Sequence, residues 1–197
     1  MTEPASESRA PFDPVAGLFI AMDQRPESLA PVSVCALSPF QRALLVIDGT
    51  VTTFIEAYAS EPVSIVRIDQ YPGHAQGDAR WLACEPAEAV IRRRTLLRGA
   101  VSDTLYAYAT SVIVPARLSS RMRTGLEAEP EGLGKILLDS GLETRREGLW
   151  YGQEELTDLP AALDLPVMQC LSRSYRVFAG GLPLMLITER FPLSPPV

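Results

Sequence analysis

The stretch LSRSYRVFAGGLPLMLITERF, residues 171–191, decides the fold. Residue character alternates from Leu171 to Ala179, Gly180-Gly181 supplies a turn, and the chain runs back from Leu184 to Phe191. A Gly-Gly pair between two such runs is a strong signal for a β-hairpin. The sequence therefore predicts two long antiparallel strands in this segment.

Similar signals recur toward the N-terminus. Further strands are expected at residues 63–69, 89–97, 104–114 and 143–152, a loop at 71–80 and a turn region at 157–166. Helices are expected at residues 37–47, 50–58, 116–126 and 132–138, where Ser38 with Pro39 begins the first and Thr50 or Asp48 caps the second. Strands joined by short turns, with helices in separate blocks, predict an α+β fold on a mostly antiparallel sheet.

Proline is concentrated near the N-terminus. Six of the 17 prolines lie within the first 39 residues. We expect residues 1–37 to form a proline-rich arm that wraps the body or is partly disordered, and residues 38–197 to form the domain.

The composition excludes several classes of function. The 197 residues carry 24 acidic and 18 basic side chains, for a net charge of −6. This balance disfavours nucleic-acid binding, which usually needs clustered positive charge. His74 is the only histidine, so a three-histidine zinc site is impossible, and its expected place in a surface loop gives it no chemistry.

The cysteines and the apolar runs indicate a soluble, cytoplasmic protein. Cys35, Cys84 and Cys170 are odd in number and widely spaced, which is typical of reduced thiols. The longest early apolar run, residues 15–22, is too short to span a bilayer. We expect no metal and no partner among nucleic acids or membranes, and the oligomeric state stays open.

Two charged residues fall on apolar strand faces. In residues 89–97, Arg93 shares a face with Ile91, Thr95 and Leu97, so it points inward if that face is the core. Glu189 shares a face with Met185, Ile187 and Phe191. The alternatives are a solvated basic strand for Arg93 and an exposed strand end for Glu189. Buried charges that persist are usually paired or functional, so an inward Arg and Glu predict a small pocket for a compact anion bearing a hydroxyl.

The hairpin sequence RSYRVFAGGLPLMLITERFP, residues 173–192, resembles that of the chorismate pyruvate-lyase (4-hydroxybenzoate synthase) family. The segments LVIDGTVT at 45–52, RRTLL at 93–97 and GLGKIL at 132–137 agree with it in order and spacing, so the resemblance covers about residues 38–193. It implies a six-stranded antiparallel sheet with helices that encloses the ligand under two flaps. It also implies a cofactor-independent lyase that removes pyruvate from chorismate, a small-molecule substrate, to give 4-hydroxybenzoate.

The resemblance also implies four site residues. The carboxylate-binding arginine falls on Arg93, and the glutamate that meets the 4-hydroxyl falls on Glu189. Backbone N–H groups at Leu133 and near Thr50 bind substrate, although the best-known members carry a larger apolar residue in place of Thr50. Aromatisation drives this reaction and no nucleophile is required, which explains how a chain with one histidine could be an enzyme.

Two other functions remain open. The fold also resembles the effector domains of a class of bacterial transcription regulators, so the chain could be a non-catalytic small-ligand-binding domain. A family member could also catalyse another elimination or cyclisation in secondary metabolism. A pocket too large for a benzoate would favour the latter function, and a snug pocket would count against it.

Overall fold

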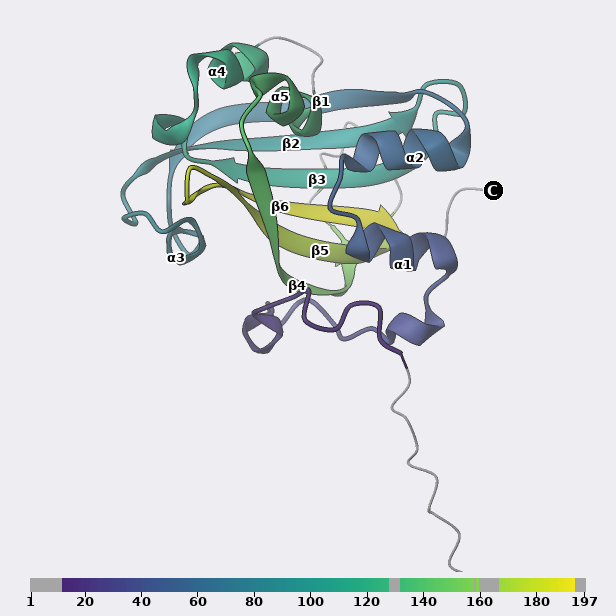
Figure 1. Cartoon of the computed structure of the whole chain (residues 1–197). Helices are drawn as coiled ribbons and strands as arrows, with labels where there is room; N and C mark the ends of the chain where they lie inside the picture. Colours follow the sequence, from purple (N-terminus) through teal and green to yellow (C-terminus); the bar gives the residue numbers. More distant parts are fainter. Residues whose placement is uncertain (1–11, 128–131, 158, 160–166, 194–197) are drawn as a thin grey trace, which may run out of the picture.

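The structure is a computed structural model that describes residues 12–127, 132–157, 159 and 167–193. Six strands in these parts of the chain form one antiparallel sheet in the order β1-β2-β3-β6-β5-β4 (Figure 1). They are β1 Val63–His74, β2 Ala89–Gly99, β3 Leu105–Ile113, β4 Thr144–Leu156, β5 Met168–Ala179 and β6 Leu182–Pro192. The predicted α+β fold and the hairpin at residues 171–191 are confirmed.

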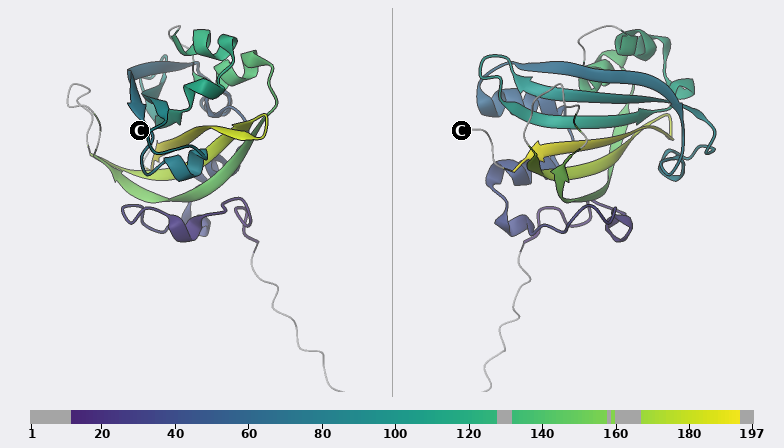
Figure 2. Two further views of the ribbon diagram at one scale, coloured as in Figure 1. Left: turned by 90° about the vertical axis from the view of Figure 1, so that its left-hand side faces the viewer. Right: turned by 180° about the vertical axis from the view of Figure 1, so that it is seen from behind.

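Two groups of helices cover one face of the sheet, which curves around them (Figure 2). The helices are α1 Pro39–Val46, α2 Val51–Ala59, α3 Ala79–Leu82, α4 Ser120–Glu127 and α5 Leu133–Ser140, with 3-10 turns at Met22–Gln24, Val34–Ala36 and Pro115–Arg117. Helices α1 and α2 pack through Leu44 and Ile55 on one part of this face. Helices α4 and α5 pack through Met122 and Ile136 on another part, so a seam lies between the two groups. The short helix α3 packs through Leu82 against the opposite face.

The loop prediction for residues 71–80 is wrong, because β1 continues to His74 and α3 begins at Ala79. Pro72 pairs with Ile91 of β2, which is possible because β1 is an edge strand and needs no second partner. His74 is exposed at the end of β1. The turn region predicted at residues 157–166 lies mostly outside the described residues.

The predicted helix at residues 116–126 is in fact two elements. A 3-10 turn ends at Arg117, and α4 begins at Ser120. The hydroxyl of Ser119 accepts a hydrogen bond from the N–H of Met122 at 3.2 Å, which starts a new helix at this point. At the elbow between α1 and α2 the N-cap is Thr50 rather than Asp48, and the Thr50 side chain makes no capping hydrogen bond.

The described part of the N-terminal segment, residues 12–37, runs along the outer edge of β4 (Figure 1). Phe19 pairs with Gly148, and Ala30 pairs with Gln153, so this segment occupies backbone groups that would otherwise form an open sheet edge. Val15 reaches the core cluster of α1 and α2. The domain boundary after residue 37 stays a prediction.

Two further observations bear on the chemical classes considered from the sequence. The helices in the described parts of the chain are all too short or too polar to cross a membrane. Among the same residues, no group of three or more His, Cys, Asp or Glu side chains could hold a metal ion. Cys35, Cys84 and Cys170 are free thiols.

Candidate functional site

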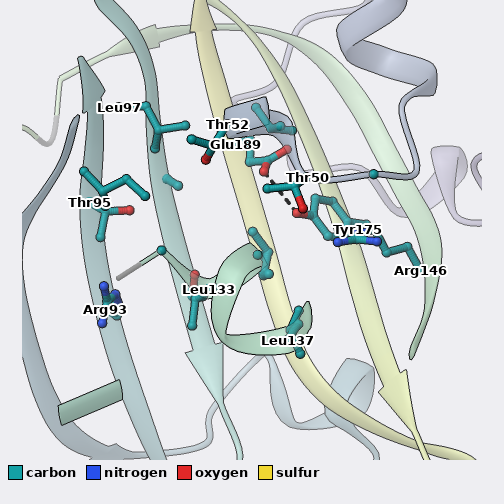
Figure 3. Close-up of a pocket in the computed structure, with 18 residues that line it drawn as sticks. Thr50, Thr52, Arg93, Thr95, Leu97, Leu133, Leu137, Arg146, Tyr175 and Glu189 are labelled. Carbon is teal, nitrogen blue, oxygen red and sulfur yellow. Dashed lines mark hydrogen bonds between the residues drawn. The ribbon is translucent and has the colours of Figure 1, made fainter. Parts of the chain in front are cut away.

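A small cavity lies in the seam between the two helix groups, above the strands β2, β3 and β6 (Figure 3). Its volume is about 70 Å³. The lining residues come from both helix groups and the sheet: Gly49, Thr50, Val51, Thr52, Ile65, Arg93, Thr95, Leu97, Ala109, Ser111, Gly132, Leu133, Gly134, Leu137, Arg146, Tyr175, Ile187 and Glu189. All four residues singled out from the sequence therefore line one cavity.

Arg93 points into the protein, as the alternation along its strand predicts. Its exposed fraction is 3%, and its Nη1 donates a hydrogen bond to Gln70 Oε1 at 2.9 Å. Burial, together with the positive charge of Arg67, lowers the pKa of Arg93 to about 10. The charged guanidinium is thus destabilised where it lies, so an anion bound beside it would be strongly favoured.

The neighbours of Arg93 behave differently. Arg92 pairs with Asp78 at 3.0 Å, and Arg94 pairs with Asp69; both side chains lie on the opposite face of β2 and are partly exposed. The alternative of a solvated basic strand is therefore wrong for Arg93, and of the three arginines it is wrong only for this one.

Glu189 is also buried, with an exposed fraction of 8%. Its Oε2 accepts a hydrogen bond from Nε of Arg173 at 2.8 Å. Its Oε1 accepts one from the hydroxyl of Tyr175 at 3.0 Å, which Figure 3 shows as a dashed line. Burial and the charge of Glu189 both raise the pKa of Tyr175, so this phenol stays protonated and remains a hydrogen-bond donor. A cation does pair with the carboxylate, as the sequence argument requires for a buried charge.

The strand register explains how these groups meet. One row across the sheet contains Thr95, Ala109, Glu189 and Arg173, and the next row contains Arg93, Ser111, Ile187 and Tyr175. Strands lie about 4.8 Å apart and alternate residues about 6.7 Å apart, which separates the Cα atoms of Arg93 and Glu189 by about 12 Å. The small side chains of Ala109 and Ser111 lie between them on β3 and leave the floor of the cavity open.

The roof consists of two helix N-termini. Thr50 is the N-cap of α2, and Leu133 is the first residue of α5. A Cβ at Gly134 would lie 2.7 Å from Cγ2 of Thr50, so the two N-termini touch only because residue 134 is glycine. The first N–H groups of a helix have no partners within the helix, and they favour negative charge nearby. The roof and Arg93 thus provide an environment suited to a carboxylate.

Sequence reasoning missed three residues of this site. Arg173 and Tyr175 contact Glu189, and Arg146 reaches the cavity from β4. Arg173 and Tyr175 share a strand face with Leu171 and Val177, which is the same kind of signal that identified Arg93. The site can therefore bind a carboxylate at one end and a hydroxyl at the other.

Known proteins share both the sequence and the fold. The family described as chorismate pyruvate-lyase Rv2949c-like matches residues 45–195. A chorismate pyruvate-lyase of Mycobacterium tuberculosis is 31% identical over 161 residues, covering 76% of this chain and 78% of the relative. The effector domain of PhnF from Mycobacterium smegmatis superposes with a TM-score of 0.56 at 11% identity, over 83% of this chain and 91% of that domain. A GntR-family transcriptional regulator from Bacillus cereus superposes with a TM-score of 0.50 at 12% identity, over 66% and 91%.

Proposed function

This chain belongs to the chorismate pyruvate-lyase family, and on that premise we propose that it removes pyruvate from chorismate to give 4-hydroxybenzoate. The observation that carries the proposal is the cavity lined by both Arg93 and Glu189. We also propose a cytoplasmic location, in keeping with the free thiols of Cys35, Cys84 and Cys170.

The two ends of the cavity suit the two ends of the substrate ring. The guanidinium of Arg93 binds the ring carboxylate, assisted by the N-terminal turns of α2 and α5 beside Thr50 and Leu133. Glu189 meets the 4-hydroxyl, and Arg173 with Tyr175 fixes the orientation of its carboxylate. The ring carbon that loses its hydrogen and the neighbouring carbon that loses its side chain then lie at the Glu189 end.

The reaction is an elimination that makes the ring aromatic. The C4–H and C3–O bonds break, the C4 hydrogen leaves as a proton, and its electron pair forms the new ring double bond. The departing enolate takes up a proton and becomes pyruvate, so no electron acceptor is needed. The contribution of the protein is to hold the reactive ring conformer and to stabilise the charge that develops near Glu189.

The cavity as it stands is too small for one ring. An engineered cavity that holds benzene has a volume of about 150 Å³. The present cavity, at about 70 Å³, is smaller, so even one ring requires the roof between Thr50 and Gly134 to move. The two roof segments, at the N-termini of α2 and α5, are therefore suited to the role of flaps.

The test is direct incubation of the purified protein with chorismate. Pyruvate is followed with lactate dehydrogenase, and 4-hydroxybenzoate by chromatography. We expect both products in equal amounts, a loss of at least about 100-fold in kcat/KM for Arg93→Ala, and little change for the control Arg92→Ala on the other face of β2. Intact chorismate with no pyruvate above background would refute the proposal.

The shared fold also makes ligand binding without turnover a candidate, since the effector domain of PhnF and a GntR-family transcriptional regulator superpose on this chain. In that case 4-hydroxybenzoate would bind through Arg93 while chorismate remained unconverted. The same incubation, combined with calorimetric titration of 4-hydroxybenzoate, separates the two functions.

A further inference from the structure

A second cavity adjoins the first, with a volume of about 170 Å³. Its lining comes from the N-terminal segment, the end of α1 and the strands β4 and β5: Leu18, Phe19, Leu45, Val46, Ile47, Asp48, Arg146, Gly148, Arg173 and Tyr175. Arg146 and Tyr175 line both cavities, so they form the wall between them. Figure 3 shows the side chain of Arg146 reaching toward Tyr175 at this wall.

Arg173 is the most deeply buried charge of the second cavity. Its exposed fraction is 4%, its Nε donates to Glu189, and its Nη1 donates to the carbonyls of Ile47 at 2.9 Å and Leu45 at 3.3 Å. Its Nη2 is buried and finds no hydrogen-bond partner among the described residues. A guanidinium N–H in this situation costs free energy until an acceptor reaches it.

Arg146 adds a second cation with the same property. Its Nη1 donates to the carbonyl of Asp48 at 2.7 Å and lies 3.7 Å from the carboxylate of Asp48, which is 79% exposed. Its Nε is buried and has no hydrogen-bond partner within the described parts of the chain. Two arginines with unsatisfied donors therefore line a cavity whose other walls are largely apolar.

We propose that this second cavity is the subsite for the carboxylate of the three-carbon enolpyruvyl side chain and, after elimination, for the pyruvate product. The inference rests on the proposed function, because it takes the ring to lie in the first cavity with its hydroxyl at Glu189. The enolpyruvyl oxygen is bonded to the carbon next to that hydroxyl, so the side chain starts beside the wall formed by Tyr175 and Arg146.

The size and polarity of the cavity fit such a ligand. Pyruvate has as many non-hydrogen atoms as benzene, and a cavity of about 150 Å³ holds benzene. Arg146 and Arg173 offer donors to a carboxylate, whereas Phe19 and Ile47 offer apolar surface to a methylene or methyl group. This assignment also gives the N-terminal segment a role, since Leu18 and Phe19 close the subsite.

The test compares two adjacent arginines of β4. Arg146→Met removes the proposed contact, and Arg145→Met is the matched control, because the side chain of Arg145 is 60% exposed and does not line either cavity. Pyruvate binding is measured by saturation-transfer NMR, 4-hydroxybenzoate binding by calorimetry, and turnover by the KM for chorismate.

We expect Arg146→Met to abolish pyruvate binding and to raise KM at least tenfold, while the Kd for 4-hydroxybenzoate changes less than about threefold. Arg145→Met should change none of these values. The variant Arg146→Lys keeps the charge without the planar fork and should give an intermediate KM, which provides a second test if the Met variant does not fold.

The inference is overturned if Arg146→Met binds pyruvate as the parent protein does, or if it loses pyruvate and 4-hydroxybenzoate to the same extent. Failure of the proposed function looks different. In that case the parent protein binds pyruvate through Arg146 but leaves chorismate intact.

Discussion

The ion pair between Arg173 and Glu189 should be strongly coupled, and a double-mutant cycle can measure this. The exposed fractions are 4% and 8%, and the contact between Nε and Oε2 measures 2.8 Å. For charge centres about 4 Å apart at an effective dielectric constant of about 20, the attraction is about 4 kcal/mol. Desolvation offsets much of this attraction, so the pair itself contributes little net stability.

Removal of one partner has a much larger effect than removal of both. Arg173→Met leaves the Glu189 carboxylate buried without its cation, and we expect a loss of about 3–5 kcal/mol in the free energy of unfolding. For a chain of this size that loss lowers Tm by about 6–20 °C. Glu189→Leu should cost a similar amount, because it leaves Arg173 buried and unpaired.

The double variant should recover most of the loss. With both charges replaced by apolar groups, one remaining cost is the Tyr175 hydroxyl, which loses its acceptor, at about 1–3 kcal/mol. The other is the loss of the donor to the carbonyls of Leu45 and Ile47, which Arg173→Met alone also carries and which therefore cancels in the cycle. The coupling energy is then at least about 3 kcal/mol, measured by urea unfolding of the parent, the two single variants and the double variant. Effects of Arg173→Met and Glu189→Leu that add to within about 0.5 kcal/mol would refute the reasoning.

Three further perturbations test other parts of the structure. With 4-hydroxybenzoate at about 100 times its Kd, the free energy of unfolding of the parent protein should rise by about 2.7 kcal/mol, measured by thermal denaturation. Arg93→Met should show no such gain. A Cβ at Gly152 would lie 2.5 Å from the carbonyl oxygen of Ala30. Gly152→Ala should therefore lower the free energy of unfolding by about 1–3 kcal/mol and speed amide hydrogen exchange at Ala30. Unchanged exchange would contradict the pairing of Ala30 with Gln153. Hydrogen bonds from Ser102 and Tyr106 lower the pKa of Glu61 from 4.5 to about 2. The stability that the Glu61 carboxylate contributes is therefore present above about pH 4.5 and is lost as the pH falls toward 2. The difference in urea midpoint between the parent protein and Glu61→Gln should shrink over that range.

The sequence predicts the positions of Arg93 and Glu189 because both lie in long strands with regular alternation. A single charged residue among apolar neighbours of the same parity must be inside if that face is the core, and both are. The antiparallel sheet follows from the Gly-Gly turn and from the short connections between the other strands. Alternation therefore gave the face of each residue, and the burial of both side chains in the structure shows that this face is the inner one.

Arg173 could not be placed opposite Glu189 by the same reasoning. Next to the turn Phe178 pairs with Pro183, and continuation of that register would set Thr188 opposite Arg173. A bulge between Val177 and Phe178 shifts the pairing by one residue and brings Glu189 there instead. A shift of one residue moves a side chain to the other face of the sheet, so pairing counted from the turn misplaces Arg173.

The fold by itself does not decide between catalysis and ligand binding, because regulators at 11% and 12% identity share it with this chain. For an aromatising elimination, an enzyme needs little more than a ligand-binding domain does, because the driving force resides in the substrate and the protein supplies position and charge. The distinction must then lie where bonds change, at the Glu189 end of the cavity. There Arg173 and Tyr175 bind the Glu189 carboxylate, and Tyr175 and Arg146 line both the first cavity and a second one of a size suited to the departing fragment. A domain that only binds a benzoate has no need of that second space, so its presence favours turnover of a substrate with a side chain.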